Sequence, residues 1–482
     1  MKSNIIGRKT EIERLENYVG SSRSEFIVIY GRRRVGKTFL VRELFEGQIT
    51  FRVTGMENAG MRQQLENFAF AIHRGVEPEA VPGDWNKAFR MLINHVELID
   101  DAGPKILFFD ELPWFDTHGA RFVSAFEHFW NDWAAYRRDV KLIVCGSATT
   151  WMLDKVVNSR GGLHNRATHT IRLSPFSLKE TEQYFKAFKF PYERQEIIES
   201  YMAVGGVAYY LSLFERGRSV AQNIDALCFA PGGELVGEFQ KIFKSLFKKA
   251  DNHMAVITAL TQKGAGVTRQ EIIRATGLIN NGNLTRLLHE LEECAFIRGF
   301  MSFQKTKKDK LYQLIDPFIL FYFKFMRNGN VAPGHWLKIQ ATGNYASWCG
   351  HAFEMVCLSH LDQIAHALGI DGTINTACSW TYSPPKSLPK DADEDLKHGT
   401  QIDLLIDRSD KAISICEMKY SQGEYEITKS YDALLARRLR IFSKVSKTRK
   451  SVVPTFITPN GLLNNMYARR IARQVTGDQL FE

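Results

Sequence analysis

Short apolar runs that alternate with helical patterns dominate the first third of the chain. Five of these runs read as buried strands, because their hydrophobic positions are continuous. They lie at 25–30, 49–53, 105–109, 141–145 and 168–173. Strands that alternate with helices are typical of a parallel sheet with helices on both faces. The N-terminal region is therefore predicted to be an α/β domain.

The pattern of apolar positions changes downstream. It is helical from about residue 174 to 248, and residues 252–325 then show three short helical periods followed by two strand-like stretches. Small and polar residues at 328–346 indicate a linker, and residues 347–482 mix helix and strand again. These changes predict four domains, at 1–175, 176–248, 249–327 and 340–482.

The amino-acid composition indicates the net charge of the protein and the cellular compartment that suits it. The net charge is +10, which favours polyanionic partners but also suits an ordinary solvated surface. The seven cysteines form no CxxC pair, so a disulfide framework or a zinc site is not expected. The first residues carry no apolar signal region, and no apolar stretch is long enough for a bilayer. We expect a cytoplasmic protein without a membrane partner.

The segment 31–38, Gly-Arg-Arg-Arg-Val-Gly-Lys-Thr, matches the G-x-x-x-x-G-K-[ST] pattern of a phosphate-binding loop. It follows a predicted strand and precedes a helical segment, which is the context this motif requires. Glycines let backbone N–H groups approach phosphates, lysine reaches the terminal phosphates and the threonine hydroxyl ligates magnesium. The motif therefore predicts binding of ATP with Mg²⁺. The nucleotide-binding candidates are Gly31, Arg34, Gly36, Lys37 and Thr38.

Candidates for the hydrolytic step follow later strands. Asp110 and Glu111 come directly after the strand at 105–109, where Asp110 would hold Mg²⁺ together with Thr38 and Glu111 would orient the attacking water. Ser147, after the strand at 141–145, is placed to touch the γ-phosphate, although its hydroxyl could instead cap a helix. Arg166, before the fifth strand, is a candidate for stabilising transition-state charge.

These motifs resemble the archaeal ATPase family, an AAA-related branch of the P-loop class with an extra strand between its two motifs. The resemblance covers about residues 1–245. Ile-Gly-Arg-Lys-Thr-Glu at 6–11 resembles the family's N-terminal box, which implies that Gly7 and Arg8 flank the adenine. Gly-Gly-Val-Ala-Tyr-Tyr-Leu at 205–211 resembles its lid motif, with Ala208 where the family usually has proline.

The three helical periods and the hairpin of residues 252–325 resemble a winged helix-turn-helix. Its third helix, from Asn281 or Asn283, would enter a DNA groove, and the lysines at 305, 307 and 308 would touch phosphate. The exposed positions of that helix are not strongly basic. A protein-interaction module or a part of the ATPase lid is an equally supported alternative.

The tail contains a predicted hairpin, 401–406 and 412–419, whose second strand ends in Glu417-Met418-Lys419. Side chains alternate along a strand, so Glu417 and Lys419 share a face that Asp403 can approach. This pattern resembles the PD-(D/E)xK nuclease superfamily, which implies that Asp403, Glu417 and a helical acid, here Glu354, hold Mg²⁺ or Mn²⁺, and that Lys419 is catalytic. A basic segment at 429–444 suits a phosphate backbone. The alternative is a structural salt bridge.

The whole chain resembles ATP-binding proteins that carry the DUF234 tail domain. The expected fold is α/β: a P-loop parallel-sheet ATPase core with a helical lid, a winged helix-turn-helix and a C-terminal restriction-endonuclease-like domain. One hypothesis is an ATPase joined to a nuclease that cuts nucleic acid, most plausibly DNA, in defence or mobile-element control. The others are an ATP-switched regulator with an inactive tail, and an ATPase that remodels protein partners. Whether the chain forms an oligomer is left open.

Overall fold

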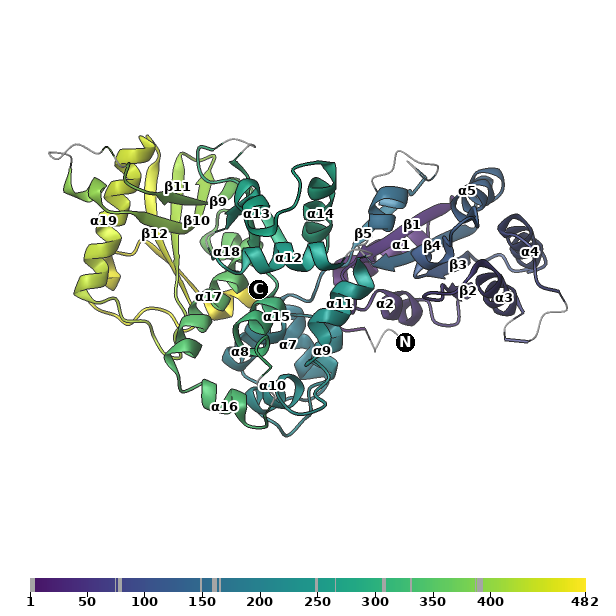
Figure 1. Ribbon diagram of the computed structural model, residues 1–482, viewed down its shortest axis with the longest axis horizontal. Coiled ribbons are helices and arrows are strands. Elements are labelled where there is room, and N and C mark those ends of the chain that lie inside the picture. The colour runs from purple at the N-terminus through teal and green to yellow at the C-terminus, as the bar shows by residue number, and fades with distance from the viewer. Residues whose placement is uncertain are drawn as a thin grey trace. The chain divides into compact units, whose positions relative to one another are not determined.

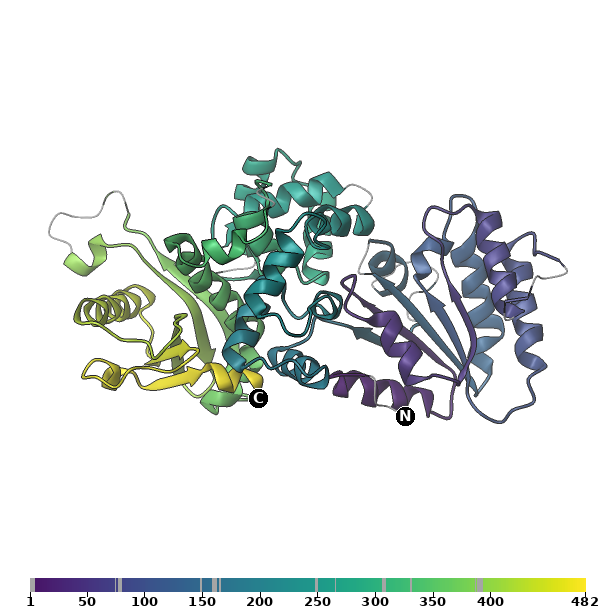
Figure 2. The same ribbon diagram turned by 90° about the horizontal axis from the view of Figure 1, so that it is seen from below.

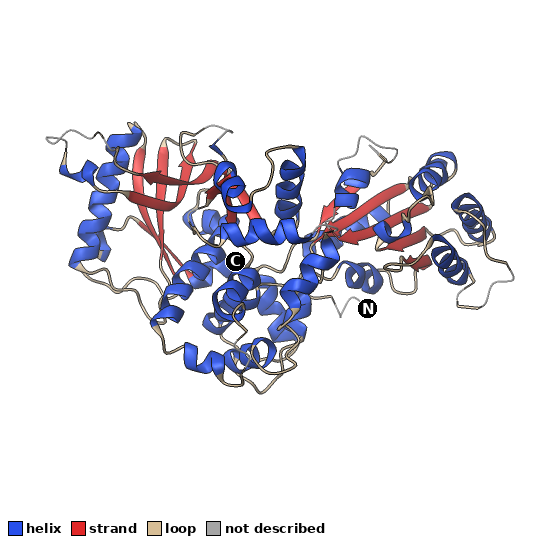
Figure 3. Cartoon of the chain, in the orientation of Figure 1, coloured by secondary structure: helices blue, strands red, loops and turns tan. Residues whose placement is uncertain are grey.

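The computed structural model describes residues 5–73, 75–76, 80–147, 150–157, 163, 166–247, 250–264, 266–305, 309–329, 332–385, 387 and 393–482. The chain forms two compact units. The first unit holds Met1–Pro175, Lys244–Lys248 and Arg286–Cys294, and the second holds Phe176–Phe243, Lys249–Thr285 and Ala295–Glu482. Two five-stranded sheets carry most of the strands (Figure 3).

The first unit is built on a parallel sheet with the order β2-β3-β4-β1-β5. The strands are β1 (Glu25–Gly31), β2 (Ile49–Thr54), β3 (Lys105–Asp110), β4 (Val140–Ser147) and β5 (His169–Arg172). All five predicted strands are present, and the predicted α/β class is confirmed. β4 lies between β1 and β3, so a further strand separates the two strands that carry the nucleotide motifs.

Helices cover both faces of this sheet (Figure 1). Because side chains alternate along a strand, Ile27 and Ile29 of β1 face a core shared with α1 (Lys9–Val19) and α2 (Lys37–Leu44). Phe26 points the other way, onto Phe126 and Trp130 of α5. That opposite core is aromatic and includes α3 (Met61–Ile72), α4 (Trp85–Glu97) and α5 (Phe122–Asp132).

The second unit begins with a group of helices around α8. The helices are α7 (Leu178–Ala187), α8 (Arg194–Val204), α9 (Ala208–Ser212) and α10 (Val220–Cys228), and α11 (Glu238–Leu246) follows. The last residues of α8 are buried, and the helix ends at Gly205 with φ 65°. A side chain at Gly206 would meet the Phe176 carbonyl oxygen at 1.9 Å. The Gly-Gly pair therefore permits a backbone approach that no other residue allows.

Residues 250–314 adopt the predicted three helices and hairpin. These are α12 (Ala250–Leu260), α13 (Arg269–Thr276), α14 (Gly282–Glu293), β7 (Ile297–Phe300) and β8 (Leu311–Leu314), with a short β6 (Val267–Thr268) beside β8. Thr268 caps α13 through its hydroxyl, as predicted. The hairpin tip is joined to the tail: the Phe303 N–H donates to the Ser379 carbonyl at 2.9 Å. Lys305 is exposed, and Lys307 and Lys308 lie outside the described residues.

The segment predicted to be a linker is partly helical, which corrects that expectation. It contains α16 (His335–Ile339), whose Trp336 is buried against Phe229, Phe321 and Trp348. Small and polar residues flank Trp336 on both sides, so the sequence pattern did not indicate that this ring anchors a helix. The remaining helices are α15 (Pro317–Phe321), α17 (Gly343–Ser359) and α18 (Leu361–Leu368).

The C-terminal sheet is mixed, with the order β13-β12-β11-β10-β9. Its strands are β9 (Ile374–Tyr382), β10 (Thr400–Arg408), β11 (Ala412–Met418), β12 (Ser451–Thr458) and β13 (Arg473–Thr476), and α19 (Lys429–Ser446) connects β11 to β12 (Figure 2). The predicted hairpin is confirmed: β10 and β11 pair antiparallel, with Leu404 opposite Cys416. Within the described part of the chain, no helix is long and apolar enough to span a membrane.

Candidate functional site

The phosphate-binding loop connects β1 to α2. A side chain at Gly31 would meet the Leu173 carbonyl oxygen at 2.3 Å, so only glycine fits there. Arg34 and Gly36 have left-handed φ values of 73° and 94°, which curl the loop around the start of α2. Backbone N–H groups at a helix start attract phosphate oxygens. The predicted loop residues therefore lie where a triphosphate chain is bound in this class of fold.

Lys37 and Thr38 start α2 and lie beside the end of β3. The Lys37 ammonium is buried and donates to the Arg32 carbonyl at 3.0 Å, and burial lowers the pKa of Lys37 against the opposing pull of Glu111 and Asp110. The Thr38 hydroxyl lies 3.0 Å from each Asp110 carboxylate oxygen. A hydroxyl and a carboxylate this close are the oxygen ligands that Mg²⁺ prefers, so both residues fit the predicted ion.

Glu111 follows β3 in a left-handed conformation, with φ 47°. Burial raises the pKa of its carboxyl, while Lys37 and the backbone N–H of Ser147 at the end of β4 act in the opposite direction. Ser147 thus lies next to Glu111 through its backbone N–H. The predicted contact of its hydroxyl with the γ-phosphate stays a prediction. The structure brings Lys37, Asp110, Glu111 and Ser147 together at the carboxyl ends of neighbouring strands, where ligands bind in open parallel sheets.

Three further predicted residues remain, which are Gly7, Arg8 and Arg166. Gly7 has φ 66°, and the Arg8 guanidinium is buried and donates to the Val35 carbonyl of the loop at 3.2 Å. This hydrogen bond joins the N-terminal box to the phosphate-binding loop, and it was not predicted from the sequence. Arg166 is exposed in a turn, and no ion pair joins its guanidinium to another described residue. Its catalytic role stays a prediction.

A second group of charged residues lies in the C-terminal part of the chain and includes Glu354, Asp403, Glu417 and Lys419. We call it the tail cluster, and Glu417 is its centre. Its carboxylate lies 3.0 Å from the Lys419 ammonium, and it also accepts hydrogen bonds from the Tyr431 hydroxyl and the Arg438 guanidinium. Tyr431 and Arg438 are seven residues apart on α19, a spacing that puts both on one face of the helix. The predicted pair is present, with Glu417 in β11 and Lys419 one residue after the strand, but the two partners of Glu417 on α19 were not predicted.

Glu354 on α17 and Asp403 on β10 face the same cluster. Burial raises the pKa of Glu354, the charge of Asp403 adds to that effect, and Lys419 opposes it. His351 Nδ1 lies 3.4 Å from the Glu354 carboxylate, and the Gln401 amide donates to Asp403. Burial acts against the charged form of Lys419 as well, but Glu417 and Glu354 outweigh it and raise the pKa of Lys419. Glu354 is therefore coupled to Asp403 and to Lys419, and Lys419 is coupled in turn to Glu417.

The donor set fits a metal ion only in part. Among the described residues, no three acids, histidines or cysteines form a group that could hold a metal. Glu417 is already neutralised by Lys419 and Arg438. Glu354 and Asp403 pair with no lysine or arginine in the part of the chain that the structure describes, and carboxylate oxygens are the ligands that a hard divalent cation prefers. The predicted three-acid metal site stays a prediction.

The basic segment at 429–444 became α19, but most of its cations already have partners. Arg440 pairs with Asp395 at 2.8 Å, Lys444 with the same aspartate at 3.7 Å and with Asp393, and Arg438 with Glu417. Arg437 and Lys429 have no ion-pair partner among the described residues. A phosphate backbone would therefore find two unpaired cations on α19, not five.

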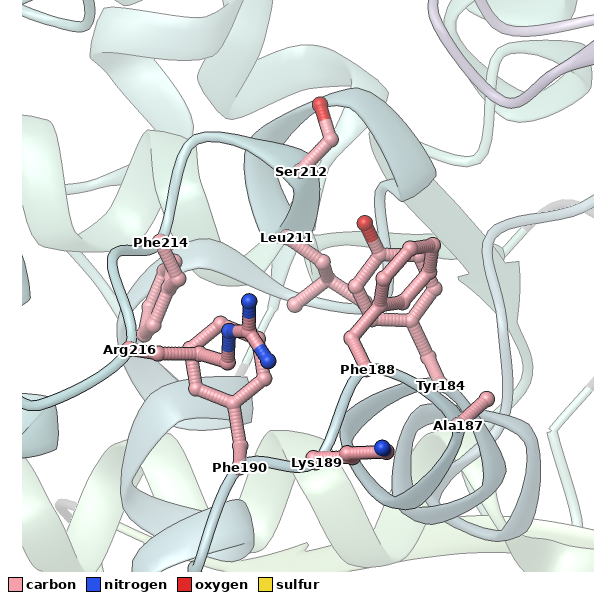
Figure 4. Close-up of a pocket in the computed structure, with 9 residues that line it drawn as sticks. All are labelled: Tyr184, Ala187, Phe188, Lys189, Phe190, Leu211, Ser212, Phe214 and Arg216. Carbon is pink, nitrogen blue, oxygen red and sulfur yellow. The ribbon is translucent and has the colours of Figure 1, made fainter.

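A separate hollow of about 390 Å³ lies among the helices next to the Gly-Gly motif. Figure 4 shows the residues that line it, with Tyr184 and Phe188 side by side and with Lys189 and Arg216 as the charged groups. The centroids of the Tyr184 and Phe188 rings are 4.7 Å apart. No acid lines it. Leu211 and Ser212 line one wall, so the hollow belongs to the helices around α8 and not to either cluster above.

Residues 5–214 match a family of proteins described as an ATPase domain predominantly from Archaea. Two proteins of Methanocaldococcus jannaschii are also similar. The uncharacterized protein MJECL04 is 24% identical over 369 residues, which cover 75% of this chain and 78% of that protein. The uncharacterized ATP-binding protein MJ0423 is 42% identical over 44 residues, which cover 9% of this chain and 75% of that protein.

Among solved structures, the Walker-type ATPase PABY2304 of Pyrococcus abyssi is 18% identical, with a TM-score of 0.48, over 66% of this chain and 95% of that one. The family match includes the phosphate loop, Asp110, Glu111 and the Gly-Gly motif, and it ends before the winged-helix-like region. Residues 5–214 are therefore an ATPase domain of the kind found predominantly in Archaea, and through it the protein binds and hydrolyses ATP.

Proposed function

We propose that this protein couples its ATPase domain to a nuclease-like tail that cuts nucleic acid, with DNA as the expected substrate. The observation that carries the proposal is the cluster in which Glu354 and Asp403 face the ion pair of Glu417 and Lys419. Burial of the charged Glu417 side chain costs free energy, and a reaction on phosphate is a reason for such a charge to be kept. Carboxylates that can bind a metal ion, next to a lysine that can stabilise negative charge, are suited to hydrolysis of a phosphodiester bond.

The residues of the cluster have separable roles in this proposal. Glu417 holds the Lys419 ammonium in place at a distance of 3.0 Å. The ammonium can then donate a hydrogen bond to a phosphate oxygen and stabilise the negative charge that develops there. Tyr431 and Arg438 fix the Glu417 carboxylate from α19. A divalent ion, held by Glu354 and Asp403, would supply an activated water and neutralise the scissile phosphate.

The test is cleavage of DNA by the full chain. Supercoiled, linear and single-stranded DNA are incubated with magnesium or manganese, with and without ATP. We expect cleavage by the wild type that Glu417→Ala and Asp403→Asn both lose, while ATP hydrolysis is unchanged. Matched exposed substitutions such as Arg90→Ala on α4 should leave cleavage intact. Cleavage that survives both tail substitutions would refute the assignment.

A second function has a specific observation in its favour. Glu417 is neutralised by two cations and a tyrosine, as expected of a structural ion cluster that performs no reaction. The protein would then be an ATP-switched regulator of a DNA or protein partner. Absence of cleavage on every substrate, together with loss of folding stability in Glu417→Ala, would favour this function.

A further inference from the structure

A pocket of about 480 Å³ opens next to the Glu417 cluster, between the segment that precedes α19 and the first turns of α19. Its lining includes Tyr425, Glu426, Thr428, Tyr431 and Arg437. Tyr431 belongs to both places, because its ring forms a wall of the pocket while its hydroxyl donates to Glu417. The size suits one small organic ligand. We call it the Tyr425 pocket.

The aromatic wall of the Tyr425 pocket is held in place. The rings of Tyr425 and Tyr431 lie 6.1 Å apart at 66°, and Phe456 of β12 lies 5.6 Å from the Tyr425 ring. The Tyr425 N–H donates to the Gly461 carbonyl at 2.8 Å, and its own carbonyl accepts from Leu463 at 3.0 Å. A wall fixed by backbone hydrogen bonds and ring packing does not need to be ordered when a ligand binds.

The polar groups of the pocket differ from those of its surroundings. Arg437 has no ion-pair partner among the described residues, whereas the neighbouring cations of α19 are paired with carboxylates. Glu426 is an exposed carboxylate in the same lining, and the Thr428 and Ser430 hydroxyls lie 3.1 Å apart. The pocket thus offers one cation, one carboxylate, hydroxyls and aromatic rings.

Only some ligands match all of these groups. Free phosphate or an acidic peptide would pair with Arg437 but would leave the tyrosine rings and Glu426 without a matching contact. A nucleotide uses every group: its base contacts the tyrosines, its amino edge donates to Glu426 or a hydroxyl, and its phosphate pairs with Arg437. A base inside a duplex cannot enter, because its faces are stacked and its edge is paired.

We propose that the Tyr425 pocket binds one unpaired nucleotide of a nucleic-acid strand. This inference rests on the proposed nuclease function, and it names the substrate class: single-stranded or frayed nucleic acid instead of intact duplex. The shared Tyr431 places the bound nucleotide beside Glu417 and Lys419. The phosphate next to that nucleotide would then lie at the tail cluster.

The first test measures binding without cleavage. Fluorescence anisotropy in EDTA compares a labelled 20-nucleotide single strand with the matching duplex. We expect the single strand to bind more tightly, and Tyr425→Ala and Arg437→Ala each to weaken that binding about tenfold without changing duplex binding. Tyr425→Phe keeps the ring and should bind like the wild type. Tyr136→Ala and Arg90→Ala are the controls, because both residues are exposed in the other unit.

A second measurement locates the base directly. A single strand that carries 5-iododeoxyuridine is irradiated in the complex, and we expect the cross-link at Tyr425 or Tyr431. Glu426→Gln should lower the affinity for oligo-deoxycytidine several-fold relative to oligo-deoxythymidine, because thymine offers no amino donor. Equal binding of strand and duplex, with no effect of Tyr425→Ala and cross-links elsewhere, would overturn the pocket. Binding and cross-linking as expected without cleavage on any substrate would refute the nuclease function alone.

Discussion

Lys37 is the residue on which ATP turnover depends most directly. Its ammonium is buried at the start of α2 with Asp110 and Glu111 close by. Lys37→Ala removes the cation that reaches the terminal phosphates, so we expect ATP hydrolysis to fall at least a hundredfold, measured as phosphate release. Lys87→Ala, at an exposed lysine of α4, is the control. Turnover that persists in Lys37→Ala would contradict the assignment of the loop.

His360 provides a pH dependence at the residue scale. Its Nε2 accepts from the Leu178 N–H at 3.0 Å, so Nδ1 carries the proton and donates to the Val356 carbonyl at 2.8 Å. Burial lowers the pKa of His360 from 6.5 to about 4. The unfolded chain binds a proton below about pH 6.5 and the folded one only near pH 4, so stability present above pH 6.5 is lost as the pH falls.

The loss should reach about 2 kcal/mol between pH 7 and pH 5. Urea unfolding of the wild type and His360→Gln measures it, and the wild type should lose stability more steeply over this range. His366→Gln is the control, because His366 is exposed on α18. Parallel pH curves for the wild type and His360→Gln would refute this account of His360.

Motif residues could be predicted from the sequence because their chemistry depends on local spacing. Lys37, Thr38, Asp110 and Glu111 needed only a strand, a turn and a helix start to be located. The partners of Glu417 could not be predicted in the same way, since Tyr431 and Arg438 reach it across a chain reversal. The seven-residue spacing on α19 was the one available signal, and nothing local to Glu417 pointed to it.

At the scale of elements, the Gly-Gly motif after α8 makes a clear prediction. A Cβ at Gly206 would lie 1.9 Å from the Phe176 carbonyl oxygen and 2.7 Å from its carbon. Gly206→Ala must displace one of two backbone segments, and we expect it to lose several kcal/mol of stability by urea unfolding. Gly350→Ala, where nothing lies within 4 Å inside α17, should instead gain about 0.5–1 kcal/mol. Equal stability of the two variants would contradict the close approach.

Strands and helices with strong periodicity were predictable, and elements held by distant contacts were not. The five parallel strands and the tail hairpin are continuous apolar runs. α16 escaped prediction because it is short and depends on Trp336, whose ring packs on residues from α15 and α17. The hairpin tip at Phe303 is likewise held by Phe442 and Ser379 of the tail and not by its own sequence.

Across the whole molecule, ATP hydrolysis and the proposed strand cleavage belong to separate parts of one chain. The ATPase site uses residues of the first compact unit, and the tail cluster uses residues of the second. The net charge of +10 suits a chain that handles a polyanion. Because the two clusters share no residue, each should be removable without the other.

One experiment tests this separation most directly. Wild type, Lys37→Ala and Lys419→Ala are incubated with single-stranded DNA, ATP and magnesium, and strand cleavage and phosphate release are measured in the same tubes. We expect the wild type to cleave the strand and to hydrolyse ATP. We expect Lys419→Ala to lose strand cleavage and to keep ATP hydrolysis. Lys37→Ala should lose ATP hydrolysis, and its cleavage shows whether ATP controls the tail. Cleavage that survives Lys419→Ala would contradict the proposal that the tail cluster cuts nucleic acid. A wild type that hydrolyses ATP but cuts no strand would contradict it as well.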